Sequence, residues 1–322
     1  MIQGIDRRSL IAGLAAAGAF AMLEETAAAA ASKPFFQRVG LPIGLQVYTL
    51  GDEPARDLDA TFAAIAGIGY REIELPNLYG RKPADVGAAA RRAGLTISSL
   101  HMPAMAGMTG GGLSLLSSPA EIAEGLHALG ATYAVMPIVP FPADFRPQAG
   151  ESFQTAIARS VTAAGEDLWK RTAALLNERA ASLKPFGIEV AYHNHNLEFA
   201  PIGETTGWDI LVREVDPHLV KFEVDMGWVV TGGNDPIAFL SGLRGRVAQL
   251  HVKDVAPGNT TNFALAMKPA EVGAGTLDWA RILPAAYAAG VRHFYVEQEP
   301  PFTIPRMEAA RRSCDFLARL HA

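Results

Sequence analysis

The chain has one cysteine, no excess of basic residues and no apolar run long enough to cross a membrane. Cys314 cannot form a disulfide within the chain, so stability has to come from the core or from a bound metal. Lys and Arg number 28 against 33 Asp and Glu, a net charge of -5, which leaves no basic surface for nucleic acid. A spanning helix needs about twenty apolar residues, and the longest run, residues 11–23, is shorter. We therefore expect no nucleic-acid partner and no membrane span.

Paired arginines precede this apolar run. Residues 6–10 read DRRSL, and alanines fill residues 27–31 after the run. A twin-arginine pair, an apolar segment and a small-residue exit are typical of a twin-arginine export signal. We expect residues 1–31 to be this signal and residues 32–322 to be a periplasmic or otherwise exported domain. The alternative is a retained N-terminal helix in a cytoplasmic protein.

Short β-branched apolar runs alternate with longer segments of helical spacing. The expected strands are 44–48, 72–75, 96–100, 133–136, 188–193, 220–225, 247–252 and 293–297. The expected helices are 57–68, 84–93, 120–129, 153–186, 208–215, 236–243, 277–289 and 305–320. Eight strand–helix units predict a single-domain α/β fold, the (β/α)8 TIM barrel, whose function lies at the C-terminal strand ends. The alternative is an open doubly wound sheet, but no G-x-G-x-x-G motif follows the first strand.

Ionisable residues gather where four of the later strands end. Segments 191–195 (AYHNH), 222–225 (FEVD), 249–254 (QLHVKD) and 295–297 (YVE) each end in residues that can bind a divalent metal. If these strands are neighbours in one sheet, their polar ends converge at one edge. Isolated buried charges cost several kcal/mol, so a metal or a substrate should compensate them. The pattern therefore indicates a metalloenzyme.

Strand alternation predicts which of these residues share a face, because residues two apart in a strand point to the same side. The expected pairs are His193 with His195, Glu223 with Asp225, His251 with Lys253, Glu297 with Glu299, Glu72 with Glu74, and Ser99 with His101.

Seven motifs together resemble a known superfamily. They are 44–48 (GLQVY), 68–74 (IGYREIE), 192–195 (YHNH), 224–227 (VDMG), 250–254 (LHVKD), 272–279 (VGAGTLDW) and 296–297 (VE). The arrangement resembles the sugar phosphate isomerase/epimerase superfamily, the xylose-isomerase-like barrels, over essentially all of residues 32–322. That superfamily includes ketose 3-epimerases, hydroxypyruvate isomerases, inosose dehydratases and lyases that act on 3-keto-glycosides. The Tyr-His-x-His run looks most like the inosose-dehydratase branch.

The resemblance implies one divalent metal ion held by His193, Asp225, His251 and Glu297. Two imidazoles and two carboxylates suit Mn²⁺, Co²⁺, Fe²⁺ or Zn²⁺ better than Mg²⁺. Many relatives have Glu where this chain has His193, and in the epimerases that Glu is one of two acid/base carboxylates. A metal-bound imidazole nitrogen cannot act as a base, so the substitution favours elimination. The alternative is that His193 and His195 are structural histidines bonded to backbone carbonyls.

The remaining site residues are assigned by position near these ligands. Lys253 would reach a substrate oxygen or the enolate; the alternative is a solvated rim lysine. The residues expected in catalysis are Lys253, Glu74, His101 and Glu297, and those expected to bind substrate are His195, Trp228 and Glu299. Glu74 and His101 could instead face water, and Trp228 could pack between barrel and helix. Glu299 and Glu198 are further base candidates, with the start of a loop as the alternative for Glu198.

These expectations describe a divalent-metal-dependent enzyme that acts on a small carbohydrate. The predicted chemistry is enolisation beside the carbonyl of a sugar or keto-glycoside, with elimination as the favoured outcome. The alternatives are a sugar isomerase or epimerase and a non-catalytic exported sugar-binding protein. We expect loops 102–118 and 137–150 to close over the ligand, and a homo-oligomer is compatible with the family.

Overall fold

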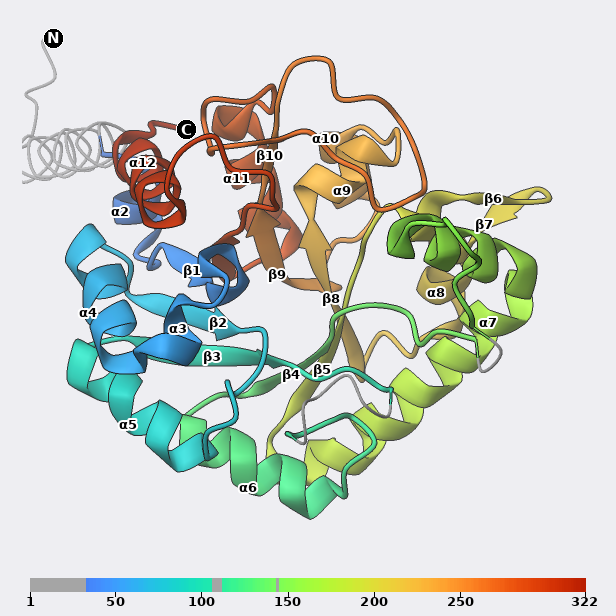
Figure 1. Cartoon of the computed structure of the whole chain (residues 1–322), viewed down its shortest axis with the longest axis horizontal. Helices are drawn as coiled ribbons and strands as arrows, with labels where there is room; N and C mark the ends of the chain where they lie inside the picture. The colour runs from blue at the N-terminus through green and yellow to red at the C-terminus, as the bar shows by residue number, and fades with distance from the viewer. Residues whose placement is uncertain (1–32, 106–111, 143–144) are drawn as a thin grey trace, which may run out of the picture.

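Eight parallel strands form a closed barrel in the order β1-β12-β9-β8-β5-β4-β3-β2 (Figure 1). The computed structural model describes residues 33–105, 112–142 and 145–322, so the expected signal and parts of both expected lids lie outside the described residues. The barrel strands are β1 (Gly44–Gln46), β2 (Glu72–Leu75), β3 (Thr96–His101), β4 (Tyr133–Met136), β5 (Glu189–His193), β8 (Val220–Asp225), β9 (Val247–Val252) and β12 (His293–Val296). The predicted TIM barrel is confirmed, and all eight expected strands are present.

Helices surround the barrel as the alternating pattern predicts (Figure 1). They are α4 (Leu58–Ile68), α5 (Pro83–Ala93), α6 (Pro119–Leu129), α7 (Phe153–Leu183), α8 (Gly207–Glu214), α10 (Pro236–Ser241), α11 (Trp279–Ala289) and α12 (Arg306–Arg319). The expected helix 153–186 is broken at Gly165, whose φ of 59° and ψ of −151° are not helical. Glycine tolerates this backbone because it has no Cβ atom.

Several short elements were not expected from the sequence. The helices among them are α2 (Phe35–Val39), α3 (Glu53–Arg56) and α9 (Met226–Thr231). The strand pairs are β6 (Pro201–Ile202) with β7 (Thr205–Thr206), and β10 (Asp254–Val255) with β11 (Pro269–Ala270). The first strand is also shorter than expected, because a 3₁₀ helix (Val47–Leu50) replaces its end. Elements of two to six residues carry too few periodic positions to be recognised.

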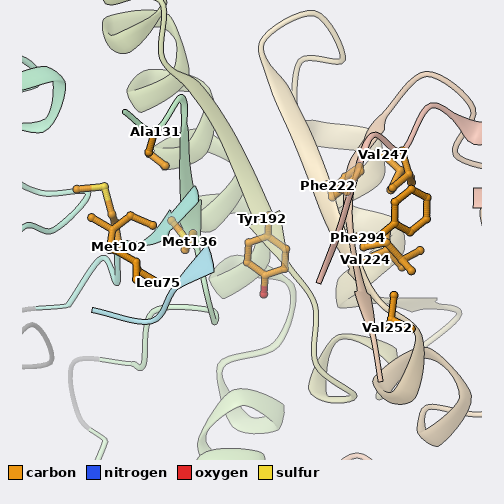
Figure 2. Close-up of a cluster of buried hydrophobic side chains, with 14 of the residues drawn as sticks. Leu75, Met102, Ala131, Met136, Tyr192, Phe222, Val224, Val247, Val252 and Phe294 are labelled. Carbon is orange, nitrogen blue, oxygen red and sulfur yellow. The ribbon is translucent and has the colours of Figure 1, made fainter. Parts of the chain in front are cut away.

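The main core lies between the strands and the helices. Figure 2 shows Phe222, Val224 and Phe294 gathered on one side of this layer, all of them buried. The ring of Phe222 packs against Trp208 of α8, with centroids 4.8 Å apart. On neighbouring strands, Tyr133, Val135 and Ala191 alternate to the other face and form a separate small cluster with Ala248 inside the barrel. The outward face of the strands is therefore apolar. The inward face carries this small cluster and can also carry polar residues.

Among the described residues, no helix is both long enough and apolar enough to cross a bilayer.

Candidate metal centre and active site

Four of the predicted residues meet at the C-terminal end of the barrel. His193, Asp225 and His251 lie on β5, β8 and β9, and Glu297 follows β12. The His193 Nε2 atom lies 3.0 Å from Nδ1 of His251 and 3.5 Å from Oδ2 of Asp225. The Nδ1 atom of His251 lies 2.7 Å from Oε2 of Glu297. One ligand atom from each residue lies within 4.8 Å of all the others, so the four residues could hold a single ion.

The chemistry of this group fits a cation. Oδ2 of Asp225 and Oε2 of Glu297 are buried and make no hydrogen bond of regular geometry among the described residues, although both lie within ion-pair distance of Lys253. Two buried carboxylates beside one ammonium leave a negative charge that a cation would compensate. Nδ1 of His193 lies 3.0 Å from the carbonyl oxygen of Pro137, to which it can donate, leaving the Nε2 lone pair free for a metal. Two imidazole nitrogens and two carboxylate oxygens suit Mn²⁺, Co²⁺, Fe²⁺ or Zn²⁺.

Glu74 contacts the opposite nitrogen of His251. Its Oε1 atom lies 2.7 Å from Nε2 of His251, so the carboxylate can hold a proton there and leave Nδ1 as the free ligand atom. Gln46 and Ser99 also donate to this carboxylate. Burial alone would raise the pKa of Glu74, but the imidazoles of His101 and His251 hold that pKa well below its usual value. Glu74 is therefore ionised, fully buried and surrounded by donors.

A second group of possible ligands shares His251. His101 Nε2 lies 3.1 Å from Oε1 of Glu74 and 3.1 Å from Oε2 of Glu223, and these residues together with His251 form the group. Burial opposes a charge on His101, but the two carboxylates outweigh it and raise the pKa of His101 to about 10. A neutral imidazole has only one free lone pair, so His251 cannot serve both groups while it is neutral. The close contact with Glu74 favours the group that contains Asp225 and Glu297.

Lys253 lies between the ligand group and two further residues, Glu299 and Trp228. Its Nζ atom lies 2.7 Å from Asp225 Oδ2, 2.8 Å from Glu297 Oε2 and 3.3 Å from Glu299 Oε1. The same atom lies 5.1 Å from the centre of the Trp228 ring. Burial would lower the pKa of Lys253, but the carboxylates of Asp225 and Glu297 raise it well above its usual value. Lys253 is thus a buried ammonium in the site and not a solvated rim lysine.

A cavity of about 630 Å³ adjoins this lysine and is lined in part by Tyr48, His195, Trp228 and Glu299. Burial, followed by the charges of His193 and Lys253, lowers the pKa of His195 well below its usual value, so this imidazole is neutral. The nearby Glu299 carboxylate and burial raise the pKa of Tyr48 to about 12. The wall near Lys253 therefore offers a neutral imidazole, a phenol that keeps its proton and a carboxyl group.

Two predicted catalytic residues lie away from this cavity. Glu74 is fully buried beneath His251. His101 faces a separate cavity of about 20 Å³, beside Pro76 and Leu113. The three predicted substrate-binding residues, in contrast, all line the large cavity. The structure thus brings the predicted site residues into one region and arranges them in two layers.

The family model described as "Xylose isomerase-like TIM barrel" matches residues 62–320. The chain belongs to this family. The resemblance noted from the seven motifs is thereby confirmed.

Relatives within the xylose isomerase-like family include two inosose dehydratases. The inosose dehydratase of Geobacillus kaustophilus is 24% identical over 206 residues, which cover 64% of each chain. That of Lacticaseibacillus casei is 26% identical over 230 residues, which cover 66% of this chain and 69% of the relative. The chain thus spans slightly less than two thirds of the first relative. A sugar phosphate isomerase/epimerase of Parabacteroides distasonis has a TM-score of 0.63 at 24% identity, covering 86% of this chain and 94% of that one. An L-ribulose 3-epimerase has a TM-score of 0.57 at 14% identity, covering 86% and 93%. Both structures support the fold.

Several residues around the site were not predicted to belong to it. Glu223 joins the second ligand group, and its alternation with Asp225 was the available signal. The side-chain oxygen of Asn194, which directly follows β5, accepts a hydrogen bond from the Asp225 backbone N–H at 3.0 Å. This bond holds the end of β8, where the ligand Asp225 lies. Asp254 accepts hydrogen bonds from the Gly273 and Leu277 backbone N–H groups at 3.0 and 3.1 Å and from Trp279 Nε1 at 2.9 Å. The carboxylate of Asp254 is therefore occupied by structural hydrogen bonds.

Glu198, a further base candidate, is also occupied by structural contacts. Its carboxylate accepts hydrogen bonds from the Tyr192 hydroxyl at 2.6 Å and from the His195 backbone N–H at 3.0 Å. The residue is fully buried. Its role in the structure is to hold the loop that presents His195 to the cavity.

Proposed function

We propose that this member of the xylose isomerase-like family is a divalent-metal-dependent lyase that acts on a sugar or a keto-glycoside. The observation that carries the proposal is the group of two buried carboxylates and two histidines whose ligand atoms lie within 4.8 Å of one another, beside one buried lysine. The similarity to inosose dehydratases supports carbohydrate chemistry with loss of a leaving group. His193 supports elimination over two-base epimerisation because a ligand nitrogen cannot also accept a proton.

The ligand group supplies the electrophile. His193, Asp225, His251 and Glu297 would hold a divalent ion, which would supply Lewis-acid polarisation of a substrate carbonyl, worth several kcal/mol of transition-state stabilisation. Lys253 adds a fixed positive charge beside the same carboxylates, where negative charge develops on the substrate oxygen as a neighbouring proton is removed. Glu74 keeps the His251 ring in the tautomer that leaves Nδ1 free.

Glu299 is the base that the geometry favours. It lines the cavity and lies 3.3 Å from Lys253, whereas Glu74 and Glu198 are enclosed by donors. Glu299 removes the proton from the carbon beside the carbonyl and returns it to the leaving oxygen, so that a single carboxyl group serves both half-steps. Tyr48 and His195 are placed to orient the sugar hydroxyls.

Export by residues 1–31 is part of the same proposal. The twin-arginine pair and the apolar run support it, and export would favour an unphosphorylated substrate over a sugar phosphate. Isomerisation or epimerisation follows from the same enolate if the proton returns to carbon and no group leaves. A non-catalytic sugar-binding protein is the alternative that does not need a metal.

The deciding experiment is elemental analysis of the purified protein beside two variants. We expect one equivalent of a transition metal in the wild type, loss of that metal in His251→Ala, and wild-type metal content in His218→Ala, a control that removes an exposed histidine. Metal-free protein in all three samples, with unchanged folding, would contradict the proposal and favour a binding protein.

The metal-loaded protein then separates the possible reactions. Keto sugars and keto-glycosides incubated in D₂O should release a fragment and form an unsaturated ketone. Incorporation of deuterium without a released fragment would show epimerisation or isomerisation instead.

A further inference from the structure

We propose that the outer half of the large cavity binds an apolar, preferably aromatic, group that the substrate loses, so that the substrate is a glycoside with an apolar aglycone. This inference rests on the proposed lyase function and names its substrate class. Its evidence is the size of the cavity, the difference between its two ends, and the way in which its outer wall is held.

The cavity is larger than one sugar requires. Its volume is about 630 Å³, whereas a single hexose at the packing density of an organic crystal occupies roughly 200 Å³. A sugar ring placed beside Lys253 would leave more than half of the space free. A free monosaccharide or a cyclic polyol ketone has no group to fill that remainder.

The two ends of the cavity differ in chemistry. The end near Lys253 carries Tyr48, His195 and Glu299, whereas the outer part is lined by the apolar side chains of Phe153, Leu265 and Met267 and by Ser152, Gln154 and Thr155. The Phe153 side chain is 53% exposed and, together with Leu265 and Met267, gives the outer part of the cavity an apolar surface that a ligand can cover. A single sugar ring beside Lys253 would leave this surface without a ligand group against it.

Phe153 is held in place by other aromatic residues. Its ring centroid lies 5.9 Å from that of Phe141 and 5.8 Å from that of Phe145, which are 5.0 Å from each other. Phe153 is also the first residue of α7, whose N-terminus is capped by Ser152. The ring is therefore part of a prearranged aromatic wall, and such walls bind aromatic groups edge-to-face or offset.

Leu265 is presented by a strained backbone. Its φ of 52° lies in the left-handed region, which leucine rarely adopts. The Leu265 N–H donates to Oδ1 of Asn196 at 3.0 Å, and Nδ2 of Asn196 donates to the carbonyl and side-chain oxygens of Asn262 at 2.8 and 2.9 Å. Strain of this kind persists where surrounding contacts enforce it, and it concentrates at ligand sites. Glycine would relieve the strain; the Leu265 side chain packs against the core on one side and lines the cavity on the other.

The elimination step explains why an apolar group should lie there. Removal of the proton beside the carbonyl is followed by cleavage of the C–O bond at the next carbon. The bonding electrons leave with the aglycone oxygen, which takes up the proton, so the products are an unsaturated keto sugar and an alcohol or a phenol. The departing group has to extend away from the carbonyl, and the outer half of the cavity provides an apolar environment for it.

The test compares keto-glycosides that differ only in a methyl or a phenyl aglycone. We expect the wild type to favour the phenyl substrate by about tenfold or more in kcat/KM, because one methylene in an apolar pocket already contributes roughly tenfold. Phe153→Ala and Leu265→Gly should each reduce this preference and leave the methyl substrate unchanged. Equal rates with both substrates, or an unchanged preference in both variants, would overturn the proposal.

Binding of the unoxidised methyl and phenyl glycosides, measured by calorimetry, separates this inference from the proposed function. Preferred binding of the phenyl glycoside without any elimination would retain the apolar subsite and reject the lyase. Elimination with no phenyl preference in either assay would retain the lyase and reject the subsite. Leu265→Gly also guards against misfolding, because glycine accepts a φ of 52° without strain.

Discussion

The two faces of the same barrel strands differ in almost every property. On β8, Phe222 and Val224 point outward into a dry apolar layer, whereas Glu223 and Asp225 point inward among ionisable groups. The outward residues stabilise the fold through burial, at roughly 25 cal/mol per Å² of apolar surface. The inward residues are equally buried, but their charges oppose folding unless they are compensated. Burial alone therefore does not show which residues stabilise the protein.

The inward face carries more negative than positive side chains, so a further positive charge has to compensate them. Its carboxylates are Glu74, Glu223, Asp225, Glu297 and Glu299, and Lys253 is the lysine among them. The carboxylates also raise the pKa of His251 well above its usual value against the effect of burial. Bound metal and protonated imidazole are therefore alternative sources of positive charge. The outward face needs neither.

The largest expected effect comes from Phe222→Ala on the outward face. Loss of a buried aromatic side chain should lower the free energy of unfolding by about 3–5 kcal/mol, because the Trp208 ring and the Arg246 guanidinium lose their partner. Metal stoichiometry should not change. Urea titration and elemental analysis measure the two quantities.

Asp225→Asn is the matched inward substitution. It keeps the size of the side chain and the Oδ1 atom that accepts from the Trp228 backbone at 2.9 Å, but removes the ligand charge. We expect loss of metal, with a smaller fall in the stability of the metal-free protein than in Phe222→Ala. A variant that unfolds as easily as Phe222→Ala and still binds metal would erase the distinction between the two faces.

Glu74→Gln should have an intermediate effect, confined to metal affinity. Loss of a carboxylate behind a metal-bound histidine typically costs about 10–100-fold in affinity, and Glu74 lies 2.7 Å from His251 Nε2. Competition with a fluorescent chelator would measure this change at unaltered stoichiometry. Ser99→Ala, which removes only a hydrogen bond to Glu74, should change affinity less. Wild-type affinity in Glu74→Gln would show that the carboxylate does not orient the histidine.

The smallest effect concerns an ion pair at the N-terminal end of the barrel. His293 Nδ1 lies 2.7 Å from Oε1 of Glu72. Burial lowers the pKa of His293, but the hydrogen bond to Glu72 outweighs burial and leaves the pKa above its usual value of 6.5. Because folding raises this pKa, the pair stabilises the protein fully below pH 6.5, and this contribution is lost as pH rises through the raised pKa.

The difference in unfolding free energy between the wild type and Glu72→Gln isolates this pair. We expect the difference to shrink from pH 6 to pH 9, since both proteins share all other titrations. A difference that stays constant across this range would show that His293 does not carry the charge.

Local patterns predicted most of the fold and part of the site. Alternating apolar runs identified every barrel strand, because strand and helix periods are properties of neighbouring residues. Strand ends predicted that ionisable groups converge at one edge of the barrel, and the family resemblance selected His193, Asp225, His251 and Glu297 among them. The role of Glu74 could not be read in this way, since its contact with His251 joins residues 177 positions apart.

The cavity was harder to predict than the ligands. Alternation assigns a residue to a face but not to a depth along the barrel, so it did not predict that Glu74 is fully buried against His251 or that His101 faces a separate small cavity. The outer wall depends on the conformation of the loop around Leu265, which the Asn196–Asn262 contact determines. Such contacts leave no periodic signal.

Asp254 has a consequence for how this barrel can diversify. It follows Lys253 directly, and through Gly273, Leu277 and Trp279 it ties down the far end of the segment that carries Leu265 and Met267. A Cβ atom at Gly275 would approach Asp254 Oδ1 to 2.1 Å, so the tie is tightly packed. Both ends of the segment are thus clamped to one carboxylate beside the lysine. Replacements within residues 256–272 should therefore change the cavity wall formed by Leu265 and Met267 and leave the position of Lys253 unchanged.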